Sequence, residues 1–195
     1  MNRQAAIERC TSETSVSVRL TLDGAGKYAI DTGVGFFDHM LTHIAKHGLF
    51  DLEIKATGDV QVDYHHLVED VGIVLGQAFR EAVGDKAGMI RFGAGLCPMD
   101  EALVIAVLDF SGRGHLACDL SLPSPRVGKF DTELAREFFA AFAQNAHLSL
   151  HIIQQAGGNA HHILESAFKS LGRALDQATQ IDGRRTDVPS TKGTL

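Results

Sequence analysis

The chain has 195 residues, of which 45% are hydrophobic and 22% charged, and this suits one domain or two closely packed halves. Its formal charge of −6 argues against general nucleic-acid binding, and its apolar runs are shorter than the roughly 18 residues that a membrane helix needs. Three cysteines without a C-x-x-C pair indicate a reducing compartment, and residues 1–9 lack the apolar core of a signal peptide, so we expect a cytoplasmic protein.

The first half of the chain alternates between strand-like and helix-like patterns. Thr, Ser and Val dominate its first strand segment, and Gly-rich turns separate the segments that follow. The expected elements are a strand in residues 5–22, a hairpin turn at 23–26, a return strand from residue 28, a helix over 36–46, a strand over 49–54, a turn at 57–59, a short strand, and a helix over 65–83.

The second half repeats this order of elements. We expect a strand over 102–110, a hairpin turn at 111–114, a return strand over 115–120, a helix over 132–145, a strand over 148–153, and a helix over 161–179. Each half then reads β-β-α-β-(β)-α, with a small sheet and helices on one face, which predicts an internally duplicated α+β fold. The predicted division of the single compact domain is residues 1–87, residues 88–185 and a polar tail over 186–195.

A short histidine motif occurs once in each half. His65-His66-x-x-Glu69 recurs 96 positions later as His161-His162-x-x-Glu165. One copy alone is more typical of a solvated helix end, but two copies that follow the duplication favour a duplicated metal site. The similarity continues downstream at matching offsets: Leu75, Gly76, Ala78 and Ala82 correspond to Leu171, Gly172, Ala174 and Ala178.

The spacing within the motif suggests how it could bind metal. On a helix, residues three and four apart share a face, so Glu69 lies beside either histidine of its pair. His65 and His66 themselves diverge by about 100° around the axis, which suits two different ions better than one. Imidazole with carboxylate favours Mn, Fe, Co or Zn over Ca or Mg.

Further ligands are expected from the helix that precedes each motif. Three histidines lie there in the first half: His39, His43 and His47. Aligning the strands that follow the two helices places Glu137 opposite His39, and a carboxylate can also bind metal. His147 and His151 remain alternatives to Glu137.

At this point the chain resembles a known family, the imidazoleglycerol-phosphate dehydratases of histidine biosynthesis. The resemblance spans nearly the whole sequence in order, and we expect the monofunctional form without a fused phosphatase domain. The segments that carry it are residues 35–41, 47–52, 65–70, 91–93, 99–102, 109–113, 150–152, 159–162 and 189–193.

The resemblance implies two Mn²⁺ ions per active site and a 24-subunit assembly with active sites between neighbouring subunits. It implies a small phosphorylated imidazole as substrate, and neither a nucleic acid nor a membrane as partner. Many relatives have histidine where this chain has Glu137. The implied metal ligands are His39, His65, His66, Glu69, Glu137, His161, His162 and Glu165.

The implied activity is that of a Mn-dependent hydro-lyase, which converts imidazoleglycerol phosphate to imidazoleacetol phosphate. Metal on the ring nitrogens would favour an imidazolate, and a carboxylate must move the protons. Glu13 and Glu165 are the catalytic candidates, and the sequence leaves open which is acid and which is base. The residues implied in substrate or phosphate binding are Glu13, His47, Arg91, Arg113, Lys169, Ser190, Thr191 and Lys192, with the tail ordering on the substrate.

Two other classes of protein compete with this interpretation. A dinuclear metallohydrolase acting on phosphate esters would also need clustered His and Glu with basic residues. A non-catalytic metal-storage oligomer would need the ligands, but it offers no reason for Arg91, Arg113 or the Ser190–Gly193 segment.

Overall fold

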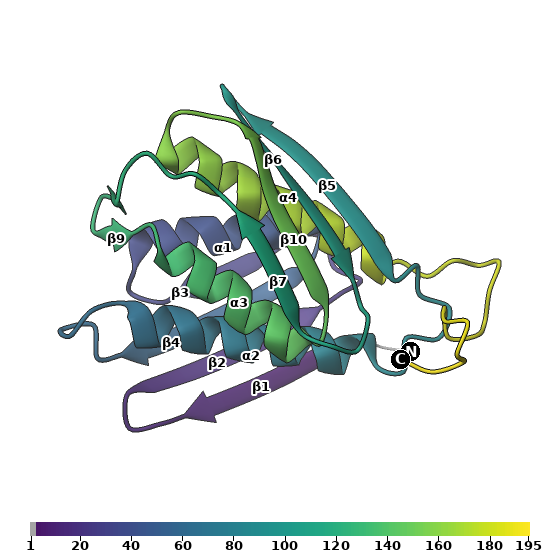
Figure 1. Cartoon of the computed structure of the whole chain (residues 1–195). Helices are drawn as coiled ribbons and strands as arrows, with labels where there is room; N and C mark the ends of the chain where they lie inside the picture. The colour runs from purple at the N-terminus through teal and green to yellow at the C-terminus, as the bar shows by residue number, and fades with distance from the viewer. Residues whose placement is uncertain (1–2) are drawn as a thin grey trace.

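A computed structural model describes residues 3–195. Met1 and Asn2 lie outside the described part; they belong to residues 1–9, which are expected not to form a signal peptide. The same six elements occur twice (Figure 1), which confirms the duplicated α+β fold. The first half contains β1 (Gln4–Cys10), β2 (Thr14–Thr21), β3 (Tyr28–Asp31), α1 (Gly35–Gly48), β4 (Asp51–Gly58) and α2 (His65–Val83). The second half contains β5 (Phe92–Met99), β6 (Ala102–Asp109), β7 (His115–Asp119), α3 (Leu134–Ala146), β10 (Ser149–Ala156) and α4 (Ala160–Thr179), with short strands β8 (Arg126–Val127) and β9 (Phe130–Asp131) before α3.

Each half forms a four-stranded sheet with the same strand order. The orders are β1-β2-β4-β3 and β5-β6-β10-β7, and only the last pair in each sheet is parallel. Alternating burial along the strands gives each sheet an apolar face, as for Val16, Val18 and Leu20 of β2. The helices of each half cover that face.

The predicted hairpins at 23–26 and 111–114 are wrong. β3 does not pair with β2, because β4 lies between them and β3 joins its far edge in parallel. The connecting loop crosses the end of β4, where the Asp51 carboxylate accepts hydrogen bonds from the backbone nitrogens of Ala25 (2.8 Å) and Lys27 (3.0 Å). β7 likewise pairs in parallel with β10, so a Gly-rich turn here marks a crossover.

Both halves also differ from the predicted order of strands, and each reads β-β-β-α-β-α. The single strand expected in residues 5–22 is two antiparallel strands joined by a tight turn at Thr11–Glu13, and the short strand expected before the first His-His helix is a turn. β5 is not among the predicted strands, because Gly93 and Gly95 interrupt the pattern of residues that is typical of a strand. A Cβ at either glycine would collide with the backbone of α4, so this strand needs glycine for close packing.

The two halves meet through their helices (Figure 1). The α1 helix packs on α4, and α2 packs on α3, so the helices form two central layers between the sheets. Equivalent glycines allow the close approach: a Cβ on Gly76 of α2 would lie 2.6 Å from the Phe142 carbonyl oxygen, and one on Gly172 of α4 would lie 3.0 Å from that of His43. This packing places the second His-His motif beside the histidines of α1.

The tail runs back over the start of β5. The backbone nitrogen of Ile90 donates to the Gln180 carbonyl (2.8 Å), and that of Gly88 donates to the Asp187 carbonyl (2.9 Å). The polar tail is therefore held against the segment that leads into β5. None of the helices between residues 3 and 195 combines the length and apolarity needed to cross a membrane.

Candidate active site

A cluster of histidines and one carboxylate lies where α1 packs on α4. The buried Glu165 carboxylate of α4 is at its centre, with Oε2 3.3 Å from Nε2 of His39 on α1 and 3.3 Å from Nε2 of His161 one turn earlier on α4. The motif spacing accounts for the second contact, since residues four apart share a helix face. The first contact joins the two halves of the chain.

His43 belongs to this cluster as well. Its Nε2 lies 3.3 Å from Nε2 of His39 and 3.6 Å from Oε1 of Glu165. Within residues 3–195, His39, His43 and Glu165 are the one group of three whose ligand atoms all fall within 4.8 Å of one another. His43 is not among the predicted ligands, although it lies on the helix from which further ligands are expected; its four-residue spacing from His39 is the signal that identifies it.

The electrostatics of the cluster keep Glu165 and His43 free of protons. Burial raises the pKa of Glu165, but the hydrogen bond from Lys169 (2.6 Å) and the nearby His43 outweigh it and bring that pKa to about 2. Burial lowers the pKa of His43 to about 4. A metal ion needs deprotonated ligands, so both side chains are in the required form at neutral pH. His47 stacks on His43 with ring centroids 5.5 Å apart.

The first motif occupies the equivalent place on α2. His65 Nε2 lies 3.9 Å from Oε2 of Glu69, again one turn apart on one helix face. His65 is half-buried and Glu69 is exposed, and no third ligand atom completes a group around them in the described part of the chain. The predicted set of eight ligands is thus divided between two places in one subunit.

Glu137 is the structural counterpart of His39. Both α1 and α3 end at a residue in the left-handed conformation, Leu49 (φ 57°) and His147 (φ 53°). His39 and Glu137 each lie ten positions before that residue, as the strand alignment predicts. Glu137 is half-buried, and across residues 3–195 no hydrogen bond or ion pair engages its carboxylate.

The adjacent histidines of each motif diverge, as expected from the helix geometry. The rings of His65 and His66 are 6.2 Å apart and nearly perpendicular, and those of His161 and His162 are similar. The second histidine of each pair has its own carboxylate: Nδ1 of His66 donates to Asp59 (3.0 Å), and Nδ1 of His162 donates to Glu101 (2.7 Å).

These hydrogen bonds have two consequences for His66 and His162. Each raises the pKa of its histidine, and each leaves Nε2 as the atom that faces a ligand. Carboxylates of this kind orient metal-binding histidines in many proteins. Neither Asp59 nor Glu101 was selected from the sequence, because only the fold brings them to their partners.

The predicted phosphate-binding residues divide into two groups. Lys169 and His47 belong to the histidine cluster. The others line a hollow of about 340 Å³ between the tail and the second sheet: Arg91, Arg113, Ser190, Thr191 and Lys192.

Within this hollow, Arg91 has a structural task. Its guanidinium makes a two-pronged ion pair with Asp109 (2.6 and 3.0 Å) and donates to the Pro189 carbonyl (2.7 Å). Arg91 therefore ties the tail to β6 and leaves Lys192 and Arg113 as the more available cations. The Arg113 guanidinium makes one long hydrogen bond, to the Ser111 carbonyl oxygen (3.4 Å).

Glu13 lies in the tight turn between β1 and β2. Its carboxylate is about half exposed, with Oε2 3.9 Å from Nδ1 of His66. It therefore faces the first motif without an ordinary hydrogen bond to it. This position is consistent with a group that reacts with a bound molecule.

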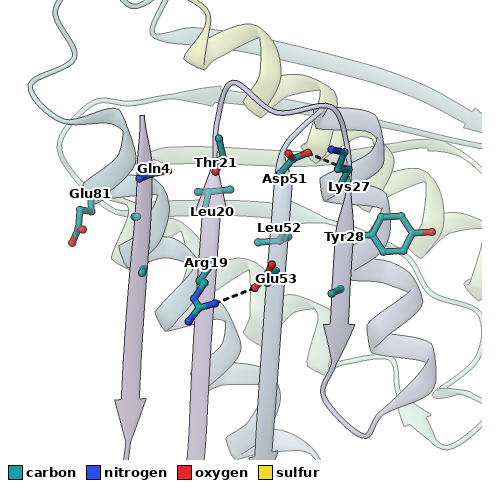
Figure 2. A pocket seen from close by; sticks show the side chains of 13 residues that line it. Gln4, Arg19, Leu20, Thr21, Lys27, Tyr28, Asp51, Leu52, Glu53 and Glu81 are labelled. Atoms are coloured by element: carbon teal, nitrogen blue, oxygen red, sulfur yellow. Dashed lines mark hydrogen bonds and ion pairs between the residues drawn. The ribbon is translucent and has the colours of Figure 1, made fainter. Parts of the chain in front are cut away.

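A second hollow, of about 600 Å³, lies on the outer face of the first sheet (Figure 2). Its side chains include Arg19 and Glu53, which form an exposed ion pair of 3.5 Å. No histidine or cysteine lines it, and among the described residues its carboxylates form no converging group of three ligand atoms. None of the residues of the two His-His motifs lines it.

Comparison with known proteins gives a consistent result. Residues 32–175 match the family model described as imidazoleglycerol-phosphate dehydratase. Proteins of that name from Desulforamulus reducens and Gluconobacter oxydans are 58% and 56% identical over 195 residues, which is all of this chain and 100% and 98% of theirs.

Solved structures agree with the sequence comparisons. The dehydratase from Staphylococcus aureus superimposes with a TM-score of 0.82 at 40% identity, over 92% of this chain and 99% of that one. The enzyme from Pyrococcus furiosus, in complex with (S)-C348, gives a TM-score of 0.84 at 39% identity, over 97% and 100% of the two chains.

Proposed function

The chain belongs to the imidazoleglycerol-phosphate dehydratase family, and from this premise we propose that it removes water from imidazoleglycerol phosphate with two Mn²⁺ ions in each active site. It is thus a hydro-lyase of histidine biosynthesis, with imidazoleacetol phosphate as its product. The observation that carries the proposal is the convergence of His39, His161 and Glu165 between the two halves.

The residues present fit a metal of this kind. Imidazole nitrogen with carboxylate oxygen is a ligand set that suits Mn²⁺, and the low pKa values of Glu165 and His43 keep those donors unprotonated. The proposed ligands fall into three groups: His39, His161 and Glu165; their counterparts Glu137, His65 and Glu69; and the Nε2 atoms of His66 and His162.

An assembly of subunits that share ligands would explain how the proposed ligands are divided. One subunit holds the ligands in two places, and the Nδ1 hydrogen bonds of His66 and His162 leave their Nε2 atoms to bind metal, with Asp100 at 3.8 Å from that of His162. Ligands from neighbouring subunits would complete the coordination of both ions, in keeping with a 24-subunit shell. A cytoplasmic location fits a biosynthetic enzyme with three unpaired cysteines.

When bound, Mn²⁺ would supply positive charge to the two ring nitrogens and so favour the imidazolate form of the substrate. The hydroxyl that leaves as water is on the carbon attached to the imidazole, and the proton comes from the next carbon, whose C–H bond is not acidic by itself, so a positioned carboxylate must accept that proton; the resulting enol then becomes the ketone. Glu13 is half exposed and suits that task, whereas Glu165 is buried and held by Lys169. We therefore assign proton transfer to Glu13 and ligation to Glu165.

The hollow under the tail suits the phosphate group. Lys192 and Arg113 supply positive charge, and Ser190 and Thr191 supply hydroxyl groups in the same place. Arg91 holds the tail there through the Pro189 carbonyl. A tail that tightens on the substrate would exclude water from the reacting atoms.

The decisive test is an assay of the purified chain with imidazoleglycerol phosphate, first after chelation and then with Mn²⁺ added back. We expect product only with the metal, and a loss of activity in the His65→Ala, His161→Ala double variant. Absence of product with Mn²⁺ would refute the proposed function. A generic phosphate ester is the control, because a metallohydrolase would cleave it and a dehydratase would not.

A further inference from the structure

Glu13 and Glu101 occupy the same place in the two halves of the fold. Each directly precedes the second strand of its sheet, β2 or β6, and each faces the second histidine of its motif. The strand pairing supports the match, since β2 and β6 pair antiparallel with β4 and β10, with one bulge in β10 between Gln154 and Ala156. The duplication therefore gave both halves a glutamate beside this histidine.

The two glutamates nevertheless make different contacts. Glu101 is fully engaged: one oxygen accepts from Nδ1 of His162 (2.7 Å), and the other accepts from the backbone nitrogens of Gly158 (3.2 Å) and Asn159 (2.9 Å). Glu13 makes no such contact, and its carboxylate is 3.9 Å from Nδ1 of His66.

Asp59 accounts for this difference. It follows the last residue of β4, and its carboxylate accepts a hydrogen bond from Nδ1 of His66 (3.0 Å). Its backbone nitrogen also donates to the carbonyl of Glu13 (3.1 Å), so Asp59 contacts both partners. The bulge in β10 makes Gly157 the counterpart of Gly58, since a Cβ on Gly58 would approach Thr14 and Leu67, and one on Gly157 would approach Ala102 and Ile163. The counterpart of Asp59 is therefore Gly158, which has no side chain, so Glu101 orients the histidine in the second half.

We propose that Asp59 is a positioning residue that takes over the orientation of His66 and so keeps the Glu13 carboxylate available to the substrate. Without Asp59, Glu13 would turn onto His66 as Glu101 does onto His162. The inference rests on the role assigned to Glu13 under the proposed function.

The test is a double-mutant cycle of Asp59→Ala and Glu13→Gln, with kcat measured at saturating Mn²⁺. We expect Asp59→Ala to lower kcat about tenfold or more, as loss of such partners does elsewhere. In the Glu13→Gln background, Asp59→Ala should lower kcat less than about twofold, because the Glu13 carboxylate is then already absent. Asp59→Asn keeps an oxygen for Nδ1–H and should restore most of kcat. A crystal structure of Asp59→Ala should show Glu13 hydrogen-bonded to His66.

Each alternative result has a distinct meaning. If Asp59→Ala lowers kcat by the same factor in both backgrounds, Asp59 does not act through Glu13 and the inference is overturned. Wild-type kcat in Asp59→Ala also overturns it, while a large loss in Glu13→Gln alone leaves the role of Glu13 intact. Wild-type kcat in Glu13→Gln overturns both the role of Glu13 and the inference.

Discussion

Nε2 of His39 and Oε2 of Glu165 lie 3.3 Å apart, although 126 positions separate the two residues in the chain. His39 belongs to the first half of the duplicated fold, and Glu165 belongs to the second. Their contact depends on the packing of α1 against α4, so the site and the interface between the halves are one structural feature.

Glu165→Gln should abolish tight Mn²⁺ binding. The amide lacks the negative charge of the carboxylate that contacts two histidines and Lys169, and we expect the affinity for Mn²⁺ to fall by more than about 100-fold. Isothermal titration calorimetry with Mn²⁺ measures this directly. Glu53→Gln, on the outer face of the first sheet, is the matched control and should bind as wild type does. Equal affinities in the two variants would count against the site.

Gly76→Ala should destabilise the fold despite the better helix propensity of alanine. The new Cβ would lie 2.6 Å from the Phe142 carbonyl oxygen and 2.9 Å from the Ala146 nitrogen, so α2 and α3 must move apart. We expect a loss of about 1–3 kcal/mol in the free energy of unfolding, measured by urea denaturation. Gly183→Ala is the control, because nothing lies within 4 Å of its Cβ position. Unchanged stability in Gly76→Ala would disprove the close approach.

Arg91→Lys should weaken substrate binding more than catalysis. Lysine cannot reproduce the two-pronged pair with Asp109 and the third contact to Pro189, so the tail loses its anchor. We expect a KM raised about tenfold with kcat nearly retained, and faster proteolysis of the tail. Arg19→Lys, whose exposed ion pair lies on the outer sheet face, should change neither quantity. A fall in kcat at constant KM would instead place Arg91 in the chemistry.

His147 should make stability depend on pH below its ordinary pKa. Burial, with Arg80 and Lys86 nearby, lowers the pKa of His147 in the folded chain, and its Nε2 contacts Arg80 at 3.2 Å. The unfolded chain therefore takes up this proton first, at pH values below about 6.5, so the contribution is present above that pH and is lost as the pH falls.

The comparison is between wild type and His147→Asn, since asparagine tolerates the left-handed conformation at this helix end. Urea unfolding at pH 7.5 and pH 5.0 should show a larger loss of stability for wild type than for the variant. The other nine histidines are common to both proteins and cancel in the difference. An equal loss in both would show that His147 titrates normally.

The features that the sequence determined are local or repeated. Apolar periodicity located all four long helices, and the two His-His-x-x-Glu motifs revealed the duplication. The divergence of adjacent histidines also followed, because the helical rotation per residue is the same in every α-helix. The alignment of Glu137 with His39 needed only the repeated order of elements.

Tertiary structure alone decided which segments meet. A Gly-rich turn in the sequence does not say whether the next strand pairs with its neighbour or crosses to the far edge, and here β3 and β7 cross. Side chains brought together from distant segments, such as Glu101 with His162 or Arg91 with Pro189, leave no periodic signal. Local patterns specify which face of an element is buried, whereas close packing between elements selects the partner, and this chain assembles its site from such partners.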